Sequence, residues 1–559
     1  MAEPSAAPPW WQRTVVYQIY PRSFADSNGD GIGDLLGVID RLDYLRELGV
    51  ETLWLSPFYK SPQRDFGYDI SSHYEIAAEY GTLDDCRRLF DAAHARGLRV
   101  VLDMVLNHTS SEHPWFLDSR SSRSSDKRDF YIWRPGRRPG GKAPPNNWRS
   151  MIGPRGWHHD PVTDEWYFAS FLPFQPDLNW RNPRVKAAMF DVVRHWLRAG
   201  ADGLRLDIFN ALFKDPSFPD NPPSLRALPS EDNPDGFFQR NLYTINHPDT
   251  LAFARELRAV IDEFCDPPRF LVGEVFGAPE LLRRYCQSRP ELSDGLHLVF
   301  LFKTMQTAVT AKALRALLAE YEREFPAPLC PTFVLGNHDR PRVSERVGGD
   351  ERKLRVLATV QLTARGVPFV YQGEELGLRN LDLPLVGALD PLAAGYRFVP
   401  RAAARALRRR GVQINRDECR APMQWSAAPN AGFARPEARP WLPVHPDYVY
   451  RNVEAYSKDP SSLLGLYRRL LALRAAHPAL HAGELRLWDE ARTLPTVLGY
   501  QRRAGGRALD VLVNCQDGES SCELGPRAGP VLLSTHGEAL RDGRRLRLRP
   551  YEALIVEAG

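Results

Sequence analysis

Three short apolar runs, widely separated in the chain, each end in a carboxylate. The runs are residues 203–207, 270–274 and 332–339, and they end in Asp207, Glu274 and Asp339. Apolar runs of this length are typical of strands that are buried in a parallel sheet. Because the carboxyl ends of the strands in a parallel barrel open onto one face, we expect the three side chains to meet there.

The order of the predicted elements supports a barrel. The predicted strands are residues 15–20, 52–55, 99–104, 203–207, 270–274, 295–299, 332–339 and 366–371. Helices with one apolar face are predicted between them, for example at residues 35–48, 83–96 and 183–199. Alternating strands and helices are the signature of a parallel α/β fold, and eight such strands close a (β/α)₈ TIM barrel.

Two segments do not fit the alternating pattern of the barrel. Residues 105–176 show little periodicity and are too long for a simple connection, so we predict an inserted lid subdomain after the third strand. Residues 479–559 contain short alternating runs, which predict a C-terminal antiparallel β-domain. The barrel is therefore expected to comprise residues 1–104 and 177–478, with a long loop at residues 377–460 after the eighth strand.

Composition and charge restrict the partners and the location of the protein. The net charge of +4 is small for 559 residues and does not favour a nucleic-acid partner. No apolar run is long enough to span a membrane, and the N-terminus lacks the pattern of a signal peptide. The seven cysteines include no Cys-x-x-Cys pair, which predicts reduced thiols and no zinc site in a cytoplasmic protein. The Ala/Arg-rich residues 401–410 are predicted to be a solvated helix or loop.

The segment after the first predicted strand has the pattern of a calcium loop. Asp26, Asn28, Asp30 and Asp34 place oxygen atoms at alternate positions, and glycines between them permit the turn. The loop is not an EF-hand, because its twelfth position is Gly37 rather than glutamate. We predict a divalent ion here, most simply calcium, that stabilises the loop; the alternative is a polar turn that binds nothing.

The neighbours of the carboxylates indicate their chemistry. Arg205 lies two residues before Asp207, so both side chains face the same side of the strand. Its positive charge favours the ionised carboxylate that a nucleophile requires. Glu274 is followed by Val275 and Phe276, which would desolvate it and raise its pKa, as a general acid needs. A nucleophile, an acid and a third carboxylate are the set that a glycosidase requires.

Eight stretches of the sequence carry a resemblance to a known family. They are residues 17–24, 67–69, 103–108, 175–179, 203–207, 273–274, 337–339 and 420–425. In this order, they resemble the α-amylase family of glycoside hydrolases, family 13, and within it the oligo-1,6-glucosidase and α-glucosidase group. The resemblance covers nearly the whole chain.

The resemblance assigns a role to each of the three carboxylates. Asp207 would be the nucleophile that forms a β-glycosyl-enzyme. Glu274 would protonate the leaving oxygen and then activate water. Asp339 would bind sugar hydroxyls and distort the ring. The reaction would retain the anomeric configuration, for which the Asp207 and Glu274 carboxyls should lie about 5 Å apart.

The same resemblance implies further site residues. Those expected to line the pocket for the terminal glucose are Asp69, His108, Arg205 and His338. Ile208 follows the nucleophile, and Arg416 is expected near the pocket floor. Phe171 and Phe174 would form the wall on the lid side or, alternatively, pack in the core. The calcium ligands would be Asp26, Asn28, Asp30, the carbonyl of Ile32, and Asp34.

The resemblance implies an α-glucosidase that releases glucose from the non-reducing end of short α-glucosides or disaccharides. Ile208 is β-branched like the valine of many α-1,6 enzymes, whereas residues 381–384 look more like α-1,4-glucosidases, so the linkage stays open. A transglucosylase or isomerase acting on sucrose, maltose or trehalose through the same intermediate is the alternative. A catalytically dead relative, such as an amino-acid transporter heavy chain, is disfavoured because all three carboxylates are present and no membrane-spanning run occurs. We expect a monomer or a homodimer with no nucleic-acid or membrane partner.

Overall fold

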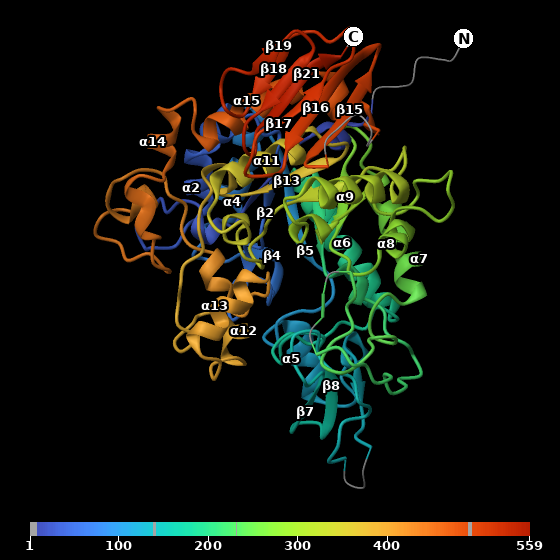
Figure 1. Ribbon diagram of the computed structural model, residues 1–559. Helices are drawn as coiled ribbons and strands as arrows, with labels where there is room; N and C mark the ends of the chain where they lie inside the picture. The colour runs from blue at the N-terminus through green and yellow to red at the C-terminus, as the bar shows by residue number, and fades with distance from the viewer. Residues whose placement is uncertain (1–7, 138–140, 228, 231, 490–494, 559) are drawn as a thin grey trace.

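An eight-stranded parallel sheet forms a barrel at the centre of the molecule (Figure 1). The computed structural model describes residues 8–137, 141–227, 229–230, 232–489 and 495–558. The strands of the sheet are β1 (Val16–Ile19), β2 (Thr52–Leu55), β5 (Arg99–Val105), β9 (Gly203–Asp207), β10 (Phe270–Gly273), β11 (Leu298–Val299), β12 (Thr332–Val334) and β13 (Val367–Tyr371). Their order in the sheet is β11-β10-β9-β5-β2-β1-β13-β12, so the predicted barrel fold is confirmed.

The barrel closes between its two end strands, β11 and β12, through hydrogen bonds of one side chain. The Thr332 hydroxyl donates to the Val299 carbonyl and accepts from the Leu301 amide, and both distances are 2.9 Å. Thr332 thus satisfies main-chain groups where the two short strands meet.

The barrel interior combines an apolar cluster with a few buried polar side chains, such as Gln18, Asp103 and Arg205. Seven strands contribute buried side chains to one interior cluster, among them Val16, Trp54, Val101, Phe270, Val272, Leu298, Val334 and Phe369. On β9 the apolar Leu204 and Leu206 pack in the outer core, so the alternate residues Arg205 and Asp207 lie on the interior side. Arg205 lies over the Trp54 ring at 5.0 Å. The strand pattern therefore directs a cation and a carboxylate into the barrel end.

Helices surround the sheet. The helices of the barrel are α2 (Leu35–Asp40), α3 (Leu42–Leu48), α4 (Leu83–His94), α6 (Pro183–Ala199), α7 (Pro248–Asp262), α8 (Pro279–Cys286), α9 (Ala311–Glu324), α10 (Val343–Arg346) and α11 (Glu351–Thr363). The single helix predicted at residues 35–48 is wrong, because Arg41 adopts a non-helical conformation with φ −110° and ψ 6°. The Arg41 guanidinium lies 4.5 Å from the Trp425 ring, a contact from a distant segment that local periodicity does not report.

A small domain extends from the barrel between β5 and β9, at the bottom of Figure 1. It contains α5 (Pro114–Ser121) and an antiparallel sheet of β6 (Trp133–Arg134), β8 (Glu165–Phe168) and β7 (Trp157–Asp160). Trp148, Trp157 and Phe168 form its buried centre. The pair β3 (Tyr59–Lys60) and β4 (Ser72–Ile76) precedes this domain in the chain.

The C-terminal part lies at the opposite end of the barrel (Figure 1). One antiparallel sheet contains β14 (Glu484–Leu487), β15 (Val497–Ala504), β16 (Arg507–Asn514), β21 (Ala553–Ala558) and β18 (Val531–Ser534). A second contains β17 (Ser520–Glu523), β20 (Arg545–Leu548) and β19 (Leu540–Asp542). The remaining helices are α1 (Trp10–Arg13), α12 (Pro391–Ala394), α13 (Arg401–Arg409), α14 (Val453–Ser457), α15 (Leu463–Ala476) and α16 (Pro478–Ala482).

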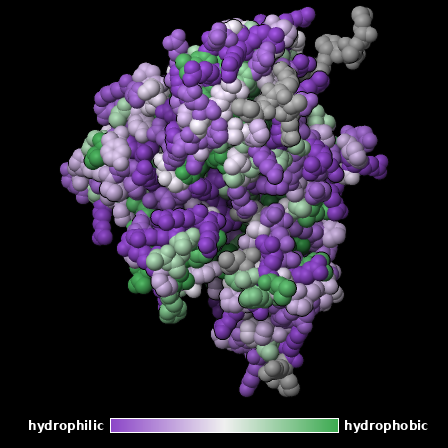
Figure 2. Space-filling view, in the orientation of Figure 1, coloured by the Kyte–Doolittle hydropathy of each residue, from purple (hydrophilic) through white to green (hydrophobic). Residues whose placement is uncertain are grey.

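The loop after β13 carries α12 and α13 and faces the small domain across a hollow (Figures 1 and 2). Helix α13 covers most of the Ala/Arg-rich segment, and none of its residues is buried, which confirms a solvated helix. Among the described helices, none is both long and apolar enough to cross a membrane. All seven cysteines are free thiols.

Candidate active site

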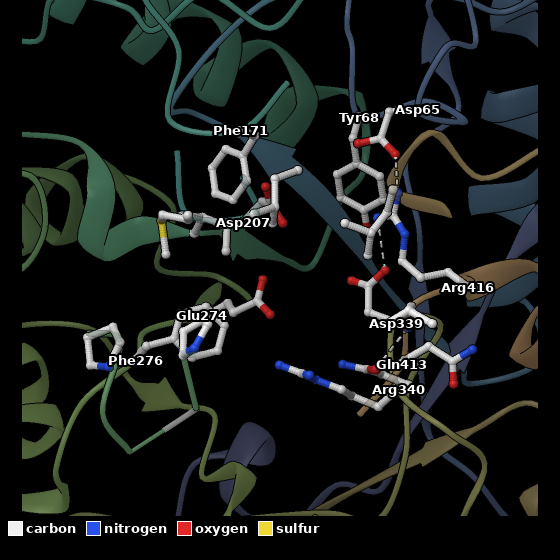
Figure 3. Close-up of a pocket in the computed structure, with 18 of the residues that line it drawn as sticks. Asp65, Tyr68, Phe171, Asp207, Glu274, Phe276, Asp339, Arg340, Gln413 and Arg416 are labelled. Atoms are coloured by element: carbon white, nitrogen blue, oxygen red, sulfur yellow. Dashed lines mark hydrogen bonds and ion pairs between the residues drawn. The ribbon is translucent and has the colours of Figure 1, made fainter. Parts of the chain in front are cut away.

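A pocket with a volume of about 290 Å³ opens where the barrel strands end. Asp207, Glu274 and Asp339 point into it (Figure 3). The polar side chains of its lining include Asp65, Tyr68, His108, Gln175, Asp207, Glu274, Asn337, Asp339 and Arg416. Its apolar lining side chains are Met151, Ile152, Phe171, Ile208, Pro229, Pro234, Phe237, Phe276, Phe302, Leu392, Leu407, Val412 and Ile414, and Ser230, Arg340, Tyr396 and Gln413 also line it.

Arg205 holds three carboxylates together beneath the pocket. The strand register places Asp103 of β5 beside Arg205 of β9. One Arg205 nitrogen, Nη1, donates to Asp103 Oδ1 and to Asp207 Oδ1, each at 2.7 Å. The other, Nη2, donates to Glu274 Oε2. The Glu274 amide donates to the Leu206 carbonyl at 2.8 Å, which fixes Glu274 next to the end of β9.

One cation cannot neutralise three buried carboxylates. Burial raises the pKa of Glu274 to about 8, against the opposing charge of Arg205. Burial also raises the pKa of Asp207 to about 7, so the expectation that Arg205 simply keeps Asp207 ionised is corrected. Arg205 lowers the pKa of Asp207, but burial outweighs it, and the negative charges of Asp103 and Asp339 add to the rise. The raised pKa of Glu274 agrees with the prediction. Because its pKa is higher than that of Asp207, Glu274 is the carboxylate of this pair that holds a proton at neutral pH.

Asp339 lies in a different electrostatic environment. Its Oδ1 accepts from Arg420 Nη2 at 2.7 Å and from Arg416 Nη1 at 3.3 Å. Burial alone would raise the pKa of Asp339, but His338 and the two guanidinium groups hold it well below its ordinary value. Burial lowers the pKa of His338 to about 3, so its ring is neutral at pH 7. The two arginines therefore keep Asp339 ionised.

His338 connects the two groups of carboxylates. Gln18 Nε2 donates to His338 Nδ1 at 2.7 Å, which leaves the proton of the neutral ring on Nε2. That nitrogen lies 2.7 Å from the Tyr68 hydroxyl, which donates to Asp103 Oδ2 at 3.0 Å. The His338 ring also stacks on Tyr68, with 5.4 Å between centroids. A continuous hydrogen-bonded chain thus fixes the floor of the pocket.

The predicted pocket residues fall into three groups. His108, Ile208 and Arg416 line the pocket. Arg205 and His338 lie directly behind the lining, at 0% exposure, where they hold the carboxylates and Tyr68. Phe171 lines the pocket and packs on His108 with 5.5 Å between ring centroids, whereas the Phe174 ring lies under the Arg64 guanidinium and not on the lining.

Asp69 does not line the pocket, and Asp65 does. The buried Asp69 carboxylate accepts from the Ser61 hydroxyl at 2.9 Å and from the amides of Arg64 and Asp65 at 3.1 and 3.0 Å. Between the two aspartates, the chain turns through positive φ angles at Phe66 and Gly67. The prediction of Asp69 as a lining residue is therefore corrected: it shapes the turn that presents Asp65.

Arg416 joins two segments that are far apart in the sequence. Its Nη2 donates to Asp65 Oδ1 at 2.6 Å and to Asp390 Oδ1 at 2.7 Å. Asp390 is buried and caps α12 by accepting from the Leu392 amide at 3.1 Å. The sequence analysis did not identify Asp390, although an aspartate before Pro391 is a helix-start signal that could have drawn attention to it. Arg416 thereby fixes α12 relative to Asp65, which lines the pocket.

Ile208 has an unusual backbone conformation. It adopts φ 41° and ψ 46°, in the left-handed region that β-branched residues rarely occupy. Its side chain packs with Ala211 and Ile245 and also faces the pocket. The turn places it immediately after Asp207, so this strained residue helps to direct the carboxylate.

The carboxylates of the predicted calcium loop hydrogen-bond to backbone amides. Asp26 accepts from Gly29 N at 2.6 Å and from Gly31 N at 2.8 Å. Asp30 accepts from the Ile32 amide, and Asp34 caps α2. In the described part of the chain, no group of three or more His, Cys, Asp or Glu side chains is arranged to hold a metal. To bind calcium here, the side-chain oxygen of Asn28 and the carbonyl oxygen of Ile32 would have to complete the set of oxygen ligands.

Comparisons with known proteins extend over nearly the whole chain. The family described as "Alpha amylase, catalytic domain" matches residues 18–483. A probable α-glucosidase of Rhizobium meliloti is 38% identical over 94% of this chain and 93% of its own length. The oligo-1,6-glucosidase of Parageobacillus thermoglucosidasius is 36% identical over 98% of this chain and 99% of its own. The crystal structure of an α-glucosyl transfer enzyme superposes with a TM-score of 0.86 at 34% identity, covering 99% of this chain and 100% of that one.

Proposed function

The chain belongs to the α-amylase family of glycoside hydrolases, and from this premise we propose that it is a retaining α-glucosidase. It would release glucose from the non-reducing end of short α-glucosides with α-1,4 or α-1,6 linkages. The observation that carries the proposal is that Asp207 and Glu274 share Arg205 at the base of one pocket. Carboxylates close enough to share one guanidinium suit the short separation of about 5–5.5 Å that distinguishes retaining from inverting glycosidases.

The proposed reaction proceeds in two displacements. Glu274 donates its proton to the glycosidic oxygen while Asp207 attacks the anomeric carbon, so the leaving group departs as an alcohol. Glu274, now ionised, removes a proton from water. The water oxygen bonds to the anomeric carbon and Asp207 leaves, which restores both groups and releases glucose with retained configuration.

The remaining polar side chains would hold the glucose. Asp339, ionised and fixed by Arg416 and Arg420, would accept sugar hydroxyls and favour a distorted ring. His108 and Asp65 line the same pocket and can bond to further hydroxyls. Arg205 and His338 would act through these groups, because both lie behind the pocket lining.

Transfer of glucose to another acceptor is the second candidate function. It would use the same glucosyl-Asp207 intermediate, with a hydroxyl of an acceptor in place of water. The likeness to an α-glucosyl transfer enzyme, with a TM-score of 0.86, favours keeping this alternative. In either case the partner is a small sugar substrate, the protein acts as a monomer or homodimer, and its seven free thiols suit the cytoplasm.

We also propose that calcium binds residues 26–34 through Asp26, Asn28, Asp30, the Ile32 carbonyl and Asp34. The supporting observation is the oxygen set, with Gly29 and Gly31 both at φ 88° permitting the tight turn. The ion would stabilise the loop and take no part in the chemistry. The test is the melting temperature with EDTA and with added calcium: calcium should raise it in the wild type but not in Asp30→Ala. An equal response in both proteins would refute the site.

Product analysis over time tests the proposed function. Maltose, isomaltose, sucrose and trehalose would be supplied separately and the sugars separated by chromatography, beside an Asp207→Asn control. Glucose from maltose or isomaltose, absent in the control, is the expected result. Early trisaccharides or isomeric disaccharides would instead establish the transfer reaction. Hydrolysis that survives in the control would refute the role of Asp207.

A further inference from the structure

We propose that a second cavity, at the end of the barrel where the strands begin, binds a phosphate group, either as the free ion or as part of a phosphate monoester. This cavity, called here the basal cavity, has a volume of about 260 Å³. Its ionisable lining side chains are Arg13, Glu51, Arg99, Arg474 and His481. The inference concerns binding alone, so it does not depend on the proposed function.

The basal cavity lies at the opposite end of the barrel from the pocket that holds the three carboxylates. Glu51 directly precedes β2 and Arg99 is the first residue of β5, whereas Asp207 is the last residue of β9. Because these strands are parallel, their first residues lie on the face opposite to Asp207. Arg474 of α15 and His481 of α16 complete the set, and α15 lies far from the small domain (Figure 1). A ligand here would not compete with a sugar in the other pocket.

Arg474 brings a buried positive charge to the wall of the basal cavity. It is 2% exposed, and its terminal nitrogens donate to the carbonyls of Leu362, Leu480 and Gly366 at 2.8–3.0 Å. Its Nε has no hydrogen-bond partner in the described part of the chain. Burial lowers the pKa of Arg474 to about 10, which leaves it charged at neutral pH. A buried guanidinium bonded only to carbonyls lacks a counter-charge, and an anion in the adjoining cavity would supply one.

Arg502 adds a second buried charge directly behind Arg474. It is 0% exposed, and its Nη1 donates to the same Leu480 carbonyl as Arg474 Nη1, each at 2.9 Å. Its other hydrogen bonds in the described part of the chain also go to backbone carbonyls. Burial and the charge of Arg474 lower the pKa of Arg502 to about 9. Two like charges that share one carbonyl favour an anion beside them.

The other ionisable side chains of the basal cavity lie nearer the solvent. Arg13 is exposed, and the partly exposed Arg99 guanidinium lies 4.3 Å from the Trp10 ring. His481 Nδ1 is buried without a hydrogen-bond partner among the described residues. Burial and the neighbouring arginines lower the pKa of His481 to about 4, so its ring is neutral at pH 7 and can donate one N–H. Glu51 is the single acidic residue among the lining side chains, all of which the structure describes.

This set of donors suits a phosphate group. Guanidinium groups bind phosphate oxygens through charge-assisted hydrogen bonds that are often bidentate. Three arginines and one glutamate leave the lining with an excess of two positive charges, which a phosphate dianion would neutralise and a chloride ion would not. The exposed residues Arg13 and Glu51 place the opening of the cavity at the surface, where the ester group of a phosphate monoester can extend into solvent.

Isothermal titration calorimetry of the full-length protein with inorganic phosphate at low ionic strength tests the site. We expect saturable binding of one phosphate with a Kd of roughly 1 mM or lower. Arg13→Gln should weaken this binding about tenfold, because it removes a charged donor. Glu51→Gln should strengthen it about threefold, because it removes the opposing charge. Arg507→Gln, exposed at the start of β16 and outside the lining, is the matched control and should bind as the wild type does.

The opposite signs expected for Arg13→Gln and Glu51→Gln make the test sharp. Absence of saturable binding to the wild type would overturn the inference, as would one and the same Kd in the wild type and both lining variants. Equal weakening in Arg13→Gln and in the Arg507→Gln control would overturn it as well. Methyl phosphate distinguishes the two sources: binding as tight as that of inorganic phosphate supports a monoester, and binding of inorganic phosphate alone supports the free ion. Either failure would leave the α-glucosidase proposal standing, because none of these residues lines the catalytic pocket.

Discussion

The carboxylates around the pocket differ in the number of cations that each one contacts. Around Arg205, three carboxylates share one guanidinium, and burial raises the pKa of Glu274 to about 8 and of Asp207 to about 7. Asp339 contacts two arginines, Arg420 and the Arg416 that also contacts Asp65 and Asp390, and its pKa is held well below its ordinary value although burial alone would raise it. The same side-chain chemistry thus yields a proton donor in one place and a permanent anion a short distance away.

The number of cations around each carboxylate, rather than its place in the pocket, therefore decides whether it acts as a proton donor or as an anion. Three carboxylates on one guanidinium keep a proton available on Glu274, and contacts from two guanidinium groups keep Asp339 ready to accept hydrogen bonds. The Asp207 and Glu274 side chains are only 9% and 7% exposed, so water screens their charges little, whereas the Asp339 side chain is 31% exposed. Each prediction below removes one element of this contrast.

Removal of the proposed nucleophile should have the largest effect. Asp207→Asn keeps the shape of the side chain and removes the attacking oxygen, so we expect kcat to fall by at least about 10⁴-fold. Steady-state hydrolysis of the preferred glucoside measures the loss. Asp191→Asn, on the exposed face of α6, is the matched control and should retain wild-type kcat. Activity of Asp207→Asn within tenfold of the wild type would refute the role.

Removal of the proposed acid should have an effect that depends on the leaving group. Glu274→Gln should lower kcat/KM by about 10²–10⁴-fold for methyl α-glucoside, whose leaving alkoxide needs a proton. The loss should be much smaller for p-nitrophenyl α-glucoside, which departs without one. Equal losses for both substrates would contradict acid catalysis by Glu274. The control is Glu280→Gln in the first turn of α8, which is exposed.

Weakening the cations around Asp339 should have an intermediate effect. Arg416→Lys keeps a charge but cannot join Asp65, Asp339 and Asp390 at once. The loss of charged hydrogen bonds worth about 1.5–3 kcal/mol predicts a fall in kcat/KM of roughly 10- to 150-fold. Arg410→Lys, an exposed residue after α13, should change nothing. If Arg416→Lys behaves like that control, the two-arginine explanation for Asp339 is wrong.

The sequence alone was enough to predict which side chains on the strands reach the site. Alternation along β9 decides that Arg205 and Asp207 face the interior, and the parallel order brings Asp103 and Glu274 beside them. The barrel and the meeting of the three carboxylates therefore followed from local patterns. The strand prediction was too long at residues 332–339, because β12 ends at Val334 and Asp339 follows in a loop.

The sequence alone was not enough to predict which side chains on the loops reach the site. From the sequence, either Asp65 or Asp69 could line the pocket. The turn with positive φ angles at Phe66 and Gly67 decides that Asp65 does. The link from Arg416 to Asp390, and the apolar lining from three distant segments, depend on how long loops fold against each other. Long loops have no periodicity from which such contacts can be inferred.

The dependence of activity on pH should show the smallest effect and test the contrast most finely. Glu274 must be protonated in the first step, so kcat/KM should fall up to tenfold per pH unit as pH rises above about 8. Asp207 must be ionised, so kcat/KM should also fall as pH drops below about 7, and the two limits belong to the pair because the groups interact. Asp339, whose pKa is lowered, should add no limb between pH 5 and pH 9. In Glu274→Gln, the residual hydrolysis of p-nitrophenyl α-glucoside should lose the basic limb, and persistence of that limb would assign it to another group.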